Sequence, residues 1–480
     1  MNSLFNKPLW KYFKQLSDIP RESGNESGVR QFILSWAKEH DLEALVDKAG
    51  NVIVKAPATA GMEHVEPLAL QGHMDMVCVR GENSSHDFTK DPISLVVDGD
   101  ILSADDTTLG ADNGIAVALI MDLLSDRSAS HGPLEAIFTV EEETGLTGAF
   151  ELDGSLIDSR RMLNIDSEEE GIFFIGCAGG NEVDGKLRIE RQPLSDHSVV
   201  YDVELSGLLG GHSGGEIHTQ RGNAIKLLTR FLYSISEQSP VRIVSIQGGT
   251  KRNVIPSSCR ATVAVSDSLQ MKDAVSSFVQ IISNEYRTIE KSISLTADRS
   301  EKQDVKAMSS EDSKTLISAL MLAPHGVQRM SGNIKGLVET SANLAIISTG
   351  EDTISLVSSH RSEIASARDA IAQITALAFQ VANAETVIGN SYPAWTPNPE
   401  SPLARFCARS YKEMTGKDAE ITAIHAGLEC GIINDRVKGM DSVSFGPDIW
   451  DAHSIKERVS ISSTERMAAF LRRLCTIIGQ

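Results

Sequence analysis

The sequence predicts an α/β protein in which a discontinuous outer domain is interrupted by a separate α+β domain. In residues 1–186, short and mostly apolar runs of strand length alternate with segments of helical periodicity. Residues 187–390 have longer runs of alternating polar and apolar residues between helical stretches, and the first pattern returns in residues 391–480. Strands that are apolar throughout are typical of sheets buried on both faces. We therefore expect the outer domain to contain a mostly parallel sheet flanked by helices.

The first part of the outer domain has clear signals for its elements. A helix is predicted after the polar stretch 22–28 by apolar residues at helical spacing: Val29, Phe32, Ile33, Trp36 and Ala37. Strands are predicted at four short runs: 52–55, 67–71, 134–140 and 162–165. A second helix is predicted over 114–124, after the turn sequence 109–113.

The inserted domain is predicted from its own alternation of strands and helices. Its first passage has alternating strands at 199–205 and 260–265 and helical stretches at 224–236 and 271–286. A second strand, strand, helix passage covers 336–347, 353–358 and 362–381, which raises the alternative that the insert holds two related halves. A proline-rich link at 392–399 then leads into the last part of the outer domain.

Composition limits the classes of partner and the compartment. The chain has 480 residues with 45 Lys and Arg against 65 Asp and Glu, a net charge of −20. A field of this sign repels phosphate backbones and anionic lipids, so nucleic acid and membranes are not expected as partners. The longest apolar stretch, 115–121, is far shorter than the roughly 20 residues of a membrane span. Residues 1–14 lack the pattern of an export signal, and the six cysteines are scattered singly, which indicates a reducing cytoplasm.

Acidic residues and histidines follow the predicted strands at the points where those strands end. They are His73 and Asp75 after 67–71, Glu141, Glu142 and Glu143 after 134–140, Asp166 after 162–165, and His453 after a run at 442–445. Asp112 opens the helix predicted at 114–124. Because ligands of open α/β sheets bind at the carboxyl ends of the strands, these side chains are expected to meet at one edge.

Each of these residues also has an ordinary explanation when it is taken alone. A His-X-Asp triplet is usually a surface or capping arrangement, Asp112 could be a helix N-cap, and three consecutive glutamates are usually a solvated loop. Their joint placement is harder to explain, since converging carboxylates repel one another unless a cation neutralises them. Imidazole and carboxylate ligands without thiolates favour zinc, with cobalt or manganese as substitutes.

The segments that carry this chemistry occur in a fixed order: 72–77, 109–114, 142–145, 164–171, 210–218 and 424–430. In this order they resemble the motifs of the co-catalytic zinc metallopeptidases, and among these the aminoacyl-histidine dipeptidases, also called cytosolic non-specific dipeptidases. The resemblance runs from near Pro8 to the final helix. It departs at Cys78 and Ile455, where this family commonly has proline, and neither change replaces a ligand.

The resemblance implies two zinc ions held by five ligands. The implied set is His73 and Asp166 for one ion, Glu143 and His453 for the other, and Asp112 as the bridge. Asp75 would hydrogen-bond His73 and fix its tautomer. Chemistry alone leaves the order within Glu141–Glu143 open, but the Glu-Glu-X-Gly pattern of the family selects Glu142 as the general base.

For the inserted domain, the resemblance implies an α+β lid domain that contacts the substrate. His212, in the glycine-rich motif 210–215, would stabilise the oxyanion, and Asn253 and Arg361 would hold the substrate. Glycine neighbours let the backbone approach a ligand, and a guanidinium can hold a carboxylate bidentately. In dimeric relatives with a smaller lid the histidine comes from the partner subunit. An insert of this length could instead complete the site within one chain.

The segment 424–430 carries three further candidates. Ala426 and Gly427 are implied as substrate contacts. His425 lies near the metal edge in the resembling proteins, but it could equally be a structural histidine.

Together the motifs and the resemblance imply a zinc-dependent dipeptidase with two Zn²⁺ per chain that acts on unblocked dipeptides. Xaa-His dipeptides are implied as substrates by the resemblance alone. Metal-activated water would attack the peptide bond while Glu142 takes its proton. One alternative is an amino-acid amide deacylase on the same metal site, and another is a non-enzymatic metal-binding or peptide-binding protein. The presence of Glu142 argues against the second alternative. A small peptide is the expected partner, and a homodimer is compatible with the motifs.

Overall fold

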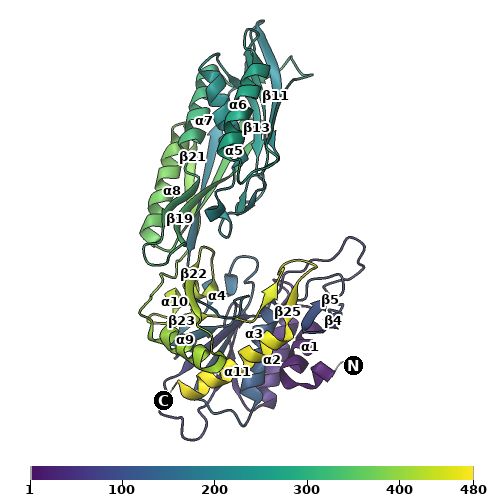
Figure 1. Ribbon diagram of the computed structural model, residues 1–480, viewed down its shortest axis with the longest axis vertical. Helices are drawn as coiled ribbons and strands as arrows, with labels where there is room; N and C mark the ends of the chain where they lie inside the picture. The colour runs from purple at the N-terminus through teal and green to yellow at the C-terminus, as the bar shows by residue number, and fades with distance from the viewer. Residues whose placement is uncertain (1–2, 479–480) are drawn as a thin grey trace. The chain divides into compact units, whose positions relative to one another are not determined.

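The computed structural model describes residues 3–478, which form two compact units (Figure 1). Unit 1 comprises the chain up to Cys177, Trp395–Ala423 and the chain from Leu428 onward. Unit 2 comprises Ala178–Ala394 and Ile424–Gly427. The sequence predicts the inserted domain at 187–390. The units divide after Cys177 and Ala394, and the segment Ile424–Gly427 also belongs to unit 2.

Unit 1 is built on a mixed eight-stranded sheet of order β1-β2-β6-β3-β7-β23-β8-β22. Its strands are β1 (Glu43–Val46), β2 (Val52–Ala56), β3 (Leu68–His73), β6 (Leu134–Thr139), β7 (Arg161–Asn164), β8 (Ile172–Cys177), β22 (Glu420–Ile424) and β23 (Asp441–Ser444). The central strands from β6 through β3 and β7 to β23 are parallel, whereas β1 with β2, β2 with β6, and β8 with β23 pair antiparallel. β3 and β6 are buried along their whole length, as their apolar sequences predict.

Helices pack with this sheet around one apolar core. They are α1 (Pro8–Ser17), α2 (Ser27–Glu39), α3 (Ala111–Ser125), α4 (Thr147–Glu151), α9 (Pro402–Thr415), α10 (Glu429–Arg436) and α11 (Ile461–Ile477), with 3-10 turns η1 (Ser3–Asn6) and η2 (Gly154–Leu156). Ser401 and Ser460 cap α9 and α11, because their hydroxyls accept backbone N–H groups in the first turn. A cluster of four aromatic rings, with centroids 5.3 to 5.7 Å apart, lies in this core: Phe173, Tyr411, Phe445 and Phe470.

A second sheet in unit 1 brings the C-terminal segment beside residues 95–104. Its order is β24-β25-β5-β4, and every pair is antiparallel. Its strands are β4 (Leu95–Asp98), β5 (Ile101–Ala104), β24 (Ile449–Trp450) and β25 (Arg458–Ser460). Because His453 lies between β24 and β25, their pairing fixes the ends of the loop that carries it.

Unit 2 contains a nine-stranded antiparallel sheet of order β16-β11-β15-β13-β19-β20-β9-β21, with β18 paired to β19. Its strands are β9 (Gly179–Arg188), β11 (Ser198–Ser206), β13 (Arg242–Gly248), β15 (Cys259–Ser266), β16 (Ser294–Arg299), β18 (Gly326–Met330), β19 (Val338–Thr349), β20 (Thr353–Ser362) and β21 (Glu385–Tyr392). Two short pairs complete it: β10 (Gln192–Pro193) with β17 (Lys306–Ala307), and β12 (Gly211–His212) with β14 (Val254–Ile255).

Four helices and this sheet enclose the core of unit 2. The helices are α5 (Ala224–Ser236), α6 (Met271–Glu285), α7 (Ser310–Leu322) and α8 (Ala365–Gln380), with a 3-10 turn η3 (Ile217–Thr219). Asn223 caps α5 by accepting the N–H groups of Ile225 and Lys226. Residues from both the earlier and the later strands enter the same large apolar cluster, and Ile217, Ile255 and Val338 form a small separate one.

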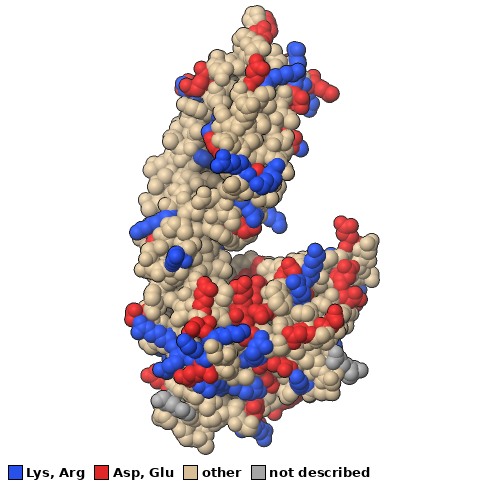
Figure 2. All heavy atoms as spheres, in the orientation of Figure 1, with Lys and Arg blue, Asp and Glu red and all other residues tan. Residues whose placement is uncertain are grey.

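The visible face of each unit carries acidic and basic side chains close together (Figure 2). Within residues 3–478, no helix combines the length and the apolar character that a membrane span needs.

The predicted fold class is confirmed, since a discontinuous α/β unit with a parallel sheet centre is interrupted by an α+β unit. Two elements differ in their ends. The helix predicted from residue 114 begins at Ala111, although Asp112 and Asn113 have non-helical backbone angles. The strand predicted to end at residue 71 extends to His73, which places this imidazole on the last residue of β3.

Candidate metal centre and active site

Parallel strands deliver acids and an imidazole to the carboxyl edge of the unit 1 sheet. His73 ends β3, Glu142 and Glu143 follow β6, and Asp166 follows β7. His73 Nε2 lies 3.0 Å from Asp112 Oδ1 and 3.6 Å from Asp166 Oδ1. One ligand atom from each of these three residues lies within 4.8 Å of the others, so a single ion could contact all three.

A second group of ligand-type atoms shares Asp112 with the first. His453 Nε2 lies 3.1 Å from Asp112 Oδ2 and 3.0 Å from Glu143 Oε2. Asp112 thus directs one oxygen to each group, which is the arrangement of a bridging carboxylate. Glu142 and Glu143 also group with His73, but of these two glutamates Glu143 is the one that contacts His453.

The groups at this edge have strongly shifted pKa values. Burial, together with the charges of neighbouring carboxylates, raises the pKa of Glu142 to about 8, and burial also raises the pKa of Asp166 well above its usual range. Hydrogen bonds to Asp112 and Glu143 raise the pKa of His453 to about 11. Gathering these acids is costly without positive charge between them. Divalent cations would supply that charge in place of protons, so the donor set fits a pair of metal ions.

Asp75 is fully buried and contacts His73 and the backbone of Glu142 and Glu143. Its Oδ1 lies 3.3 Å from His73 Nδ1 and accepts the N–H of Glu142 at 3.1 Å. Its Oδ2 accepts the N–H of Glu143 at 3.2 Å and the hydroxyl of Ser23 at 2.7 Å. Burial alone would raise its pKa, but these hydrogen bonds and the charge of His73 outweigh burial and lower the pKa of Asp75 to about 2. Asp75 therefore orients one imidazole and the backbone of both glutamates as an anion.

A buried polar layer lies one step further into the sheet. Glu429, at the start of α10, accepts the side-chain N–H of Gln71 at 2.5 Å and the hydroxyl of Thr139 at 2.6 Å. Gln71 in turn accepts the side-chain N–H of Asn164 at 2.5 Å. Gln71 and Asn164 each precede a candidate ligand by two residues, on β3 and β7. The layer therefore links the three strands whose ends carry His73, Glu143 and Asp166.

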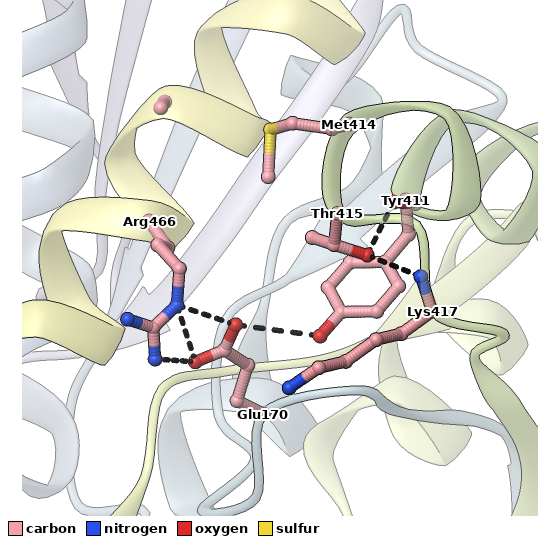
Figure 3. Close-up of a pocket in the computed structure, with 7 residues that line it drawn as sticks. Glu170, Tyr411, Met414, Thr415, Lys417 and Arg466 are labelled. Atoms are coloured by element: carbon pink, nitrogen blue, oxygen red, sulfur yellow. Dashed lines mark hydrogen bonds and ion pairs between the residues drawn. The ribbon is translucent and has the colours of Figure 1, made fainter.

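The acidic run after Asp166 divides between two environments. Burial raises the pKa of Glu168 to about 7, and the charge of Asp112 adds to this effect. Glu170 instead accepts two hydrogen bonds from Arg466 Nε, at 2.9 and 3.0 Å, and one from Arg466 Nη2 at 2.5 Å. Figure 3 shows Arg466 and Tyr411 directed at this carboxylate in a pocket of about 420 Å³. Glu170 thus anchors the loop and does not join the ligand groups.

In unit 2, the glycine-rich motif brings several predicted substrate contacts together. A Cβ placed on Gly214 would lie 3.0 Å from the His212 ring, 3.2 Å from Arg361 Nε and 2.6 Å from the carbonyl oxygen of His425. The Asn253 carbonyl accepts the N–H of Ser213 at 2.9 Å, which places Asn253 beside the same loop. The segment with Ala426 and Gly427 follows His425 directly.

Two side chains in this cluster have defined partners. Arg361 Nη1 donates to the Tyr392 hydroxyl at 2.8 Å. His425 Nε2 lies 2.7 Å from Ser341 Oγ, and burial, with the charge of Arg361, lowers the pKa of His425 to about 3. His425 is therefore neutral and held by β19, which agrees with the structural alternative left open by its sequence.

Sequence reasoning missed several residues of the metal centre in unit 1 and of the cluster in unit 2. Glu457 and Arg21, both buried, hold the backbone around Asp112, and Tyr392 contacts Arg361. Glu429 lies within the motif 424–430, and the sequence assigns it no role. At Cys78, which departs from the family pattern, burial raises the pKa of the thiol to about 12, which does not suit a nucleophile.

Comparison with known proteins adds evidence of a different kind. The chain is 39% identical to the cytosol non-specific dipeptidase of Escherichia coli (strain K12), over 99% of this chain and 98% of that relative. The model of the peptidase dimerisation domain of M20 peptidases matches residues 203–290. The chain belongs to the M20 peptidase family. The resemblance inferred from the motifs is thereby confirmed.

Two solved structures of other peptidases are similar to this chain. The aminoacylhistidine dipeptidase of Vibrio alginolyticus is 37% identical, with a TM-score of 0.90 over 98% of this chain and 96% of that chain. The aminopeptidase PepT of Bacillus cereus is 15% identical, with a TM-score of 0.60 over 98% of both chains, and shares the fold.

Proposed function

We propose that this M20 peptidase hydrolyses the peptide bond of unblocked dipeptides with two zinc ions per chain. The observation that carries the proposal is Asp112, whose two carboxylate oxygens each face a separate group of candidate ligands. The proposed ligands are His73 and Asp166 for one ion and Glu143 and His453 for the other. Relatives named cytosol non-specific dipeptidase and aminoacylhistidine dipeptidase support small peptides, Xaa-His dipeptides among them, as the substrate class.

The proposed chemistry depends on Glu142 as the general base. Two bound divalent ions supply Lewis acidity at the substrate carbonyl and lower the pKa of the attacking water. Glu142 accepts a proton from this water and delivers it to the departing amine. Two bound ions favour the ionised form of Glu142, so its carboxylate can accept the proton and hold it between the two transfers. Asp75 keeps the backbone of Glu142 and the ring of His73 in place during both transfers.

The unit 2 residues are proposed to bind the substrate. His212 Nδ1 accepts the N–H of Gly215 at 3.0 Å, so the hydrogen of its neutral ring is on Nε2 and can be donated to an oxyanion. Arg361 is proposed to bind the substrate carboxylate, with Tyr392 fixing one of its nitrogens. Asn253 and the backbone at Ala426 and Gly427 are proposed as further substrate contacts.

We also propose that the protein acts in the cytoplasm as a homodimer in which each chain has a complete active site. The match to a peptidase dimerisation domain supports association, and the name of the Escherichia coli relative supports the compartment. Of the six cysteines, five are buried and all are free, which is typical of a reducing environment.

The test is a metal titration combined with a substrate panel. Chelation should abolish hydrolysis of free dipeptides, zinc should restore it, and elemental analysis should find two ions per chain in active protein. The panel compares free dipeptides, tripeptides and acyl amino acids. One ion or none in fully active protein would contradict the two-zinc site, and faster turnover of acyl amino acids would favour a deacylase.

A further inference from the structure

Glu457 makes a set of hydrogen bonds that the proposed chemistry does not use. Its Oε2 accepts the backbone N–H of Leu109 at 2.7 Å and of Gly110 at 2.9 Å. Its Oε1 accepts the N–H of Ala111 at 2.7 Å and of Asp112 at 3.2 Å. Glu457 is 2% exposed, so these charge-assisted bonds form away from water, where they are strong. One carboxylate therefore holds four consecutive N–H groups of the turn that carries Asp112.

Arg21 holds the same turn from its carbonyl side. Its Nη2 donates to the Gly110 carbonyl at 2.5 Å, and its Nη1 donates to the carbonyls of Met74 at 3.1 Å and Asp75 at 2.9 Å. Arg21 is also 2% exposed. Because Met74 directly follows His73, this guanidinium ties the segment of one ligand to the turn that carries Asp112.

The turn and the guanidinium approach so closely that side chains are excluded. A Cβ on Gly110 would lie 2.4 Å from Arg21 Nη2 and 2.7 Å from Met76 Sδ, and Gly110 has a φ of +70°. A Cβ on Gly114 would lie 2.6 Å from the same nitrogen. The buried charges of Glu457 and Arg21 are opposite, so each offsets part of the cost of burying the other.

We propose that Glu457 is a positioning residue that fixes the Asp112 carboxylate before any ion binds, with Arg21 as its charge partner. This inference rests on the proposed role of Asp112 as the ligand shared by both ions. Glu457 lies four residues after His453, so its hydrogen bonds to the turn also connect His453 with Asp112, two ligands from distant parts of the chain. Without it, four N–H groups lose their acceptor and the turn no longer holds Asp112 in one orientation.

Glu457→Gln tests the proposal with little change in side-chain volume. The amide keeps one acceptor oxygen but directs an NH₂ group at two of the backbone donors. We expect zinc affinity, measured by competition with a chromophoric chelator on the full chain, to fall about 10- to 100-fold, the range known for outer ligand-orienting groups. The visible absorption of the Co²⁺-loaded protein should change as well, since it reports ligand geometry.

Glu135→Gln is the matched control. Glu135 is 3% exposed and accepts the backbone N–H of Asp158 at 3.1 Å and of Ser159 at 2.8 Å. It lies near the amino end of β6, whereas the proposed ligands lie at the carboxyl ends of the parallel strands. Glu135→Gln should lose about as much folding stability as Glu457→Gln. It should keep the zinc affinity and the Co²⁺ spectrum of the wild type.

The outcomes separate this inference from the proposed function. A wild-type chain that binds fewer than two ions contradicts the two-zinc site itself. A wild type with two ions and a Glu457→Gln variant of equal affinity overturns the positioning role alone. If Glu457→Gln does not fold, hydrogen exchange of the wild type tests the positioning role instead. The backbone amides of 109–112 should be protected equally with and without zinc. Protection that develops only with zinc would overturn the inference.

Discussion

Metal loading should release protons from the site, and Glu142 should account for one of them. Burial and neighbouring carboxylates raise its pKa to about 8, against an ordinary value of 4.5. At about 1.4 kcal/mol for each pH unit, ionising Glu142 without a nearby dication costs about 5 kcal/mol more than in water. At pH 7 the metal-free carboxyl is therefore mostly protonated. Two dications favour its ionised form, so the proton leaves on binding, and the contribution of Glu142 to the rise of zinc affinity with pH ends near pH 8.

Glu142→Gln removes this proton and keeps the shape of the side chain. At pH 7 the variant should still bind two zinc ions but release about one proton fewer than the wild type. Calorimetric titrations in two buffers of different ionisation enthalpy measure the number of protons, and elemental analysis measures the number of ions. The variant should also lose about 10²- to 10⁴-fold in kcat, the usual contribution of a general base.

Glu143→Gln is the comparison for this experiment, because Glu143 contacts His453 and Glu142 does not. The Glu143 variant should lose tight binding of one ion. Equal proton release by the wild type and Glu142→Gln, with two ions bound in both, would refute the argument from the raised pKa. If Glu142→Gln emptied one site while Glu143→Gln kept both ions, Glu142 would be a metal ligand, and the assignment of base and ligand within Glu141–Glu143 would be wrong by one residue.

Three further predictions concern substrate binding, subunit organisation and stability. Arg361→Ala should raise KM for dipeptides far more than for dipeptides whose carboxylate is amidated, and equal losses would contradict the carboxylate contact. Mixing inactive His212→Ala chains with inactive Glu142→Gln chains should not restore activity, whereas recovery in mixed dimers would show that the histidine acts across subunits. The Phe470 ring is fully buried and contacts three other rings. Phe470→Ala should therefore destabilise unit 1 by about 3 to 5 kcal/mol, measured by a denaturant titration that is monitored by hydrogen exchange. A loss below about 1 kcal/mol would contradict a well-packed cluster.

The ends of the parallel strands could be predicted because strand length and apolar pattern are local properties of the sequence. His73 and Asp166 follow apolar runs, and the rule for open α/β sheets then places them at one edge. Glu457 could not be found in this way. Its partners are backbone N–H groups 345 to 348 residues earlier in the chain, and every residue except proline carries such a group.

The acidic run after Asp166 shows a second limit of sequence reasoning. The pattern could not separate Glu168 from Glu170, because the two have the same side chain and similar neighbours. Their environments differ because α9 and α11 bring Tyr411 and Arg466 to Glu170, whereas Glu168 is buried near the charge of Asp112. The sequence likewise places Tyr392 only in a proline-rich link, since its contact with Arg361 depends on the pairing of β9 with β20 and β21.

The place of β23 in the unit 1 sheet has a consequence for protein synthesis. β23 (Asp441–Ser444) lies between β7 and β8, which are made more than 260 residues earlier. During translation, β7 and β8 therefore cannot pair with β23 until residues 441–444 have been made. Nearly all of unit 2, by contrast, is complete once Ala394 has been made. Since domains fold as units during translation, the inserted unit can fold before the unit that surrounds it. A nascent chain stopped before β23 would leave β7 and β8 each with an unpaired edge, the kind of surface that chaperones bind and that aggregates.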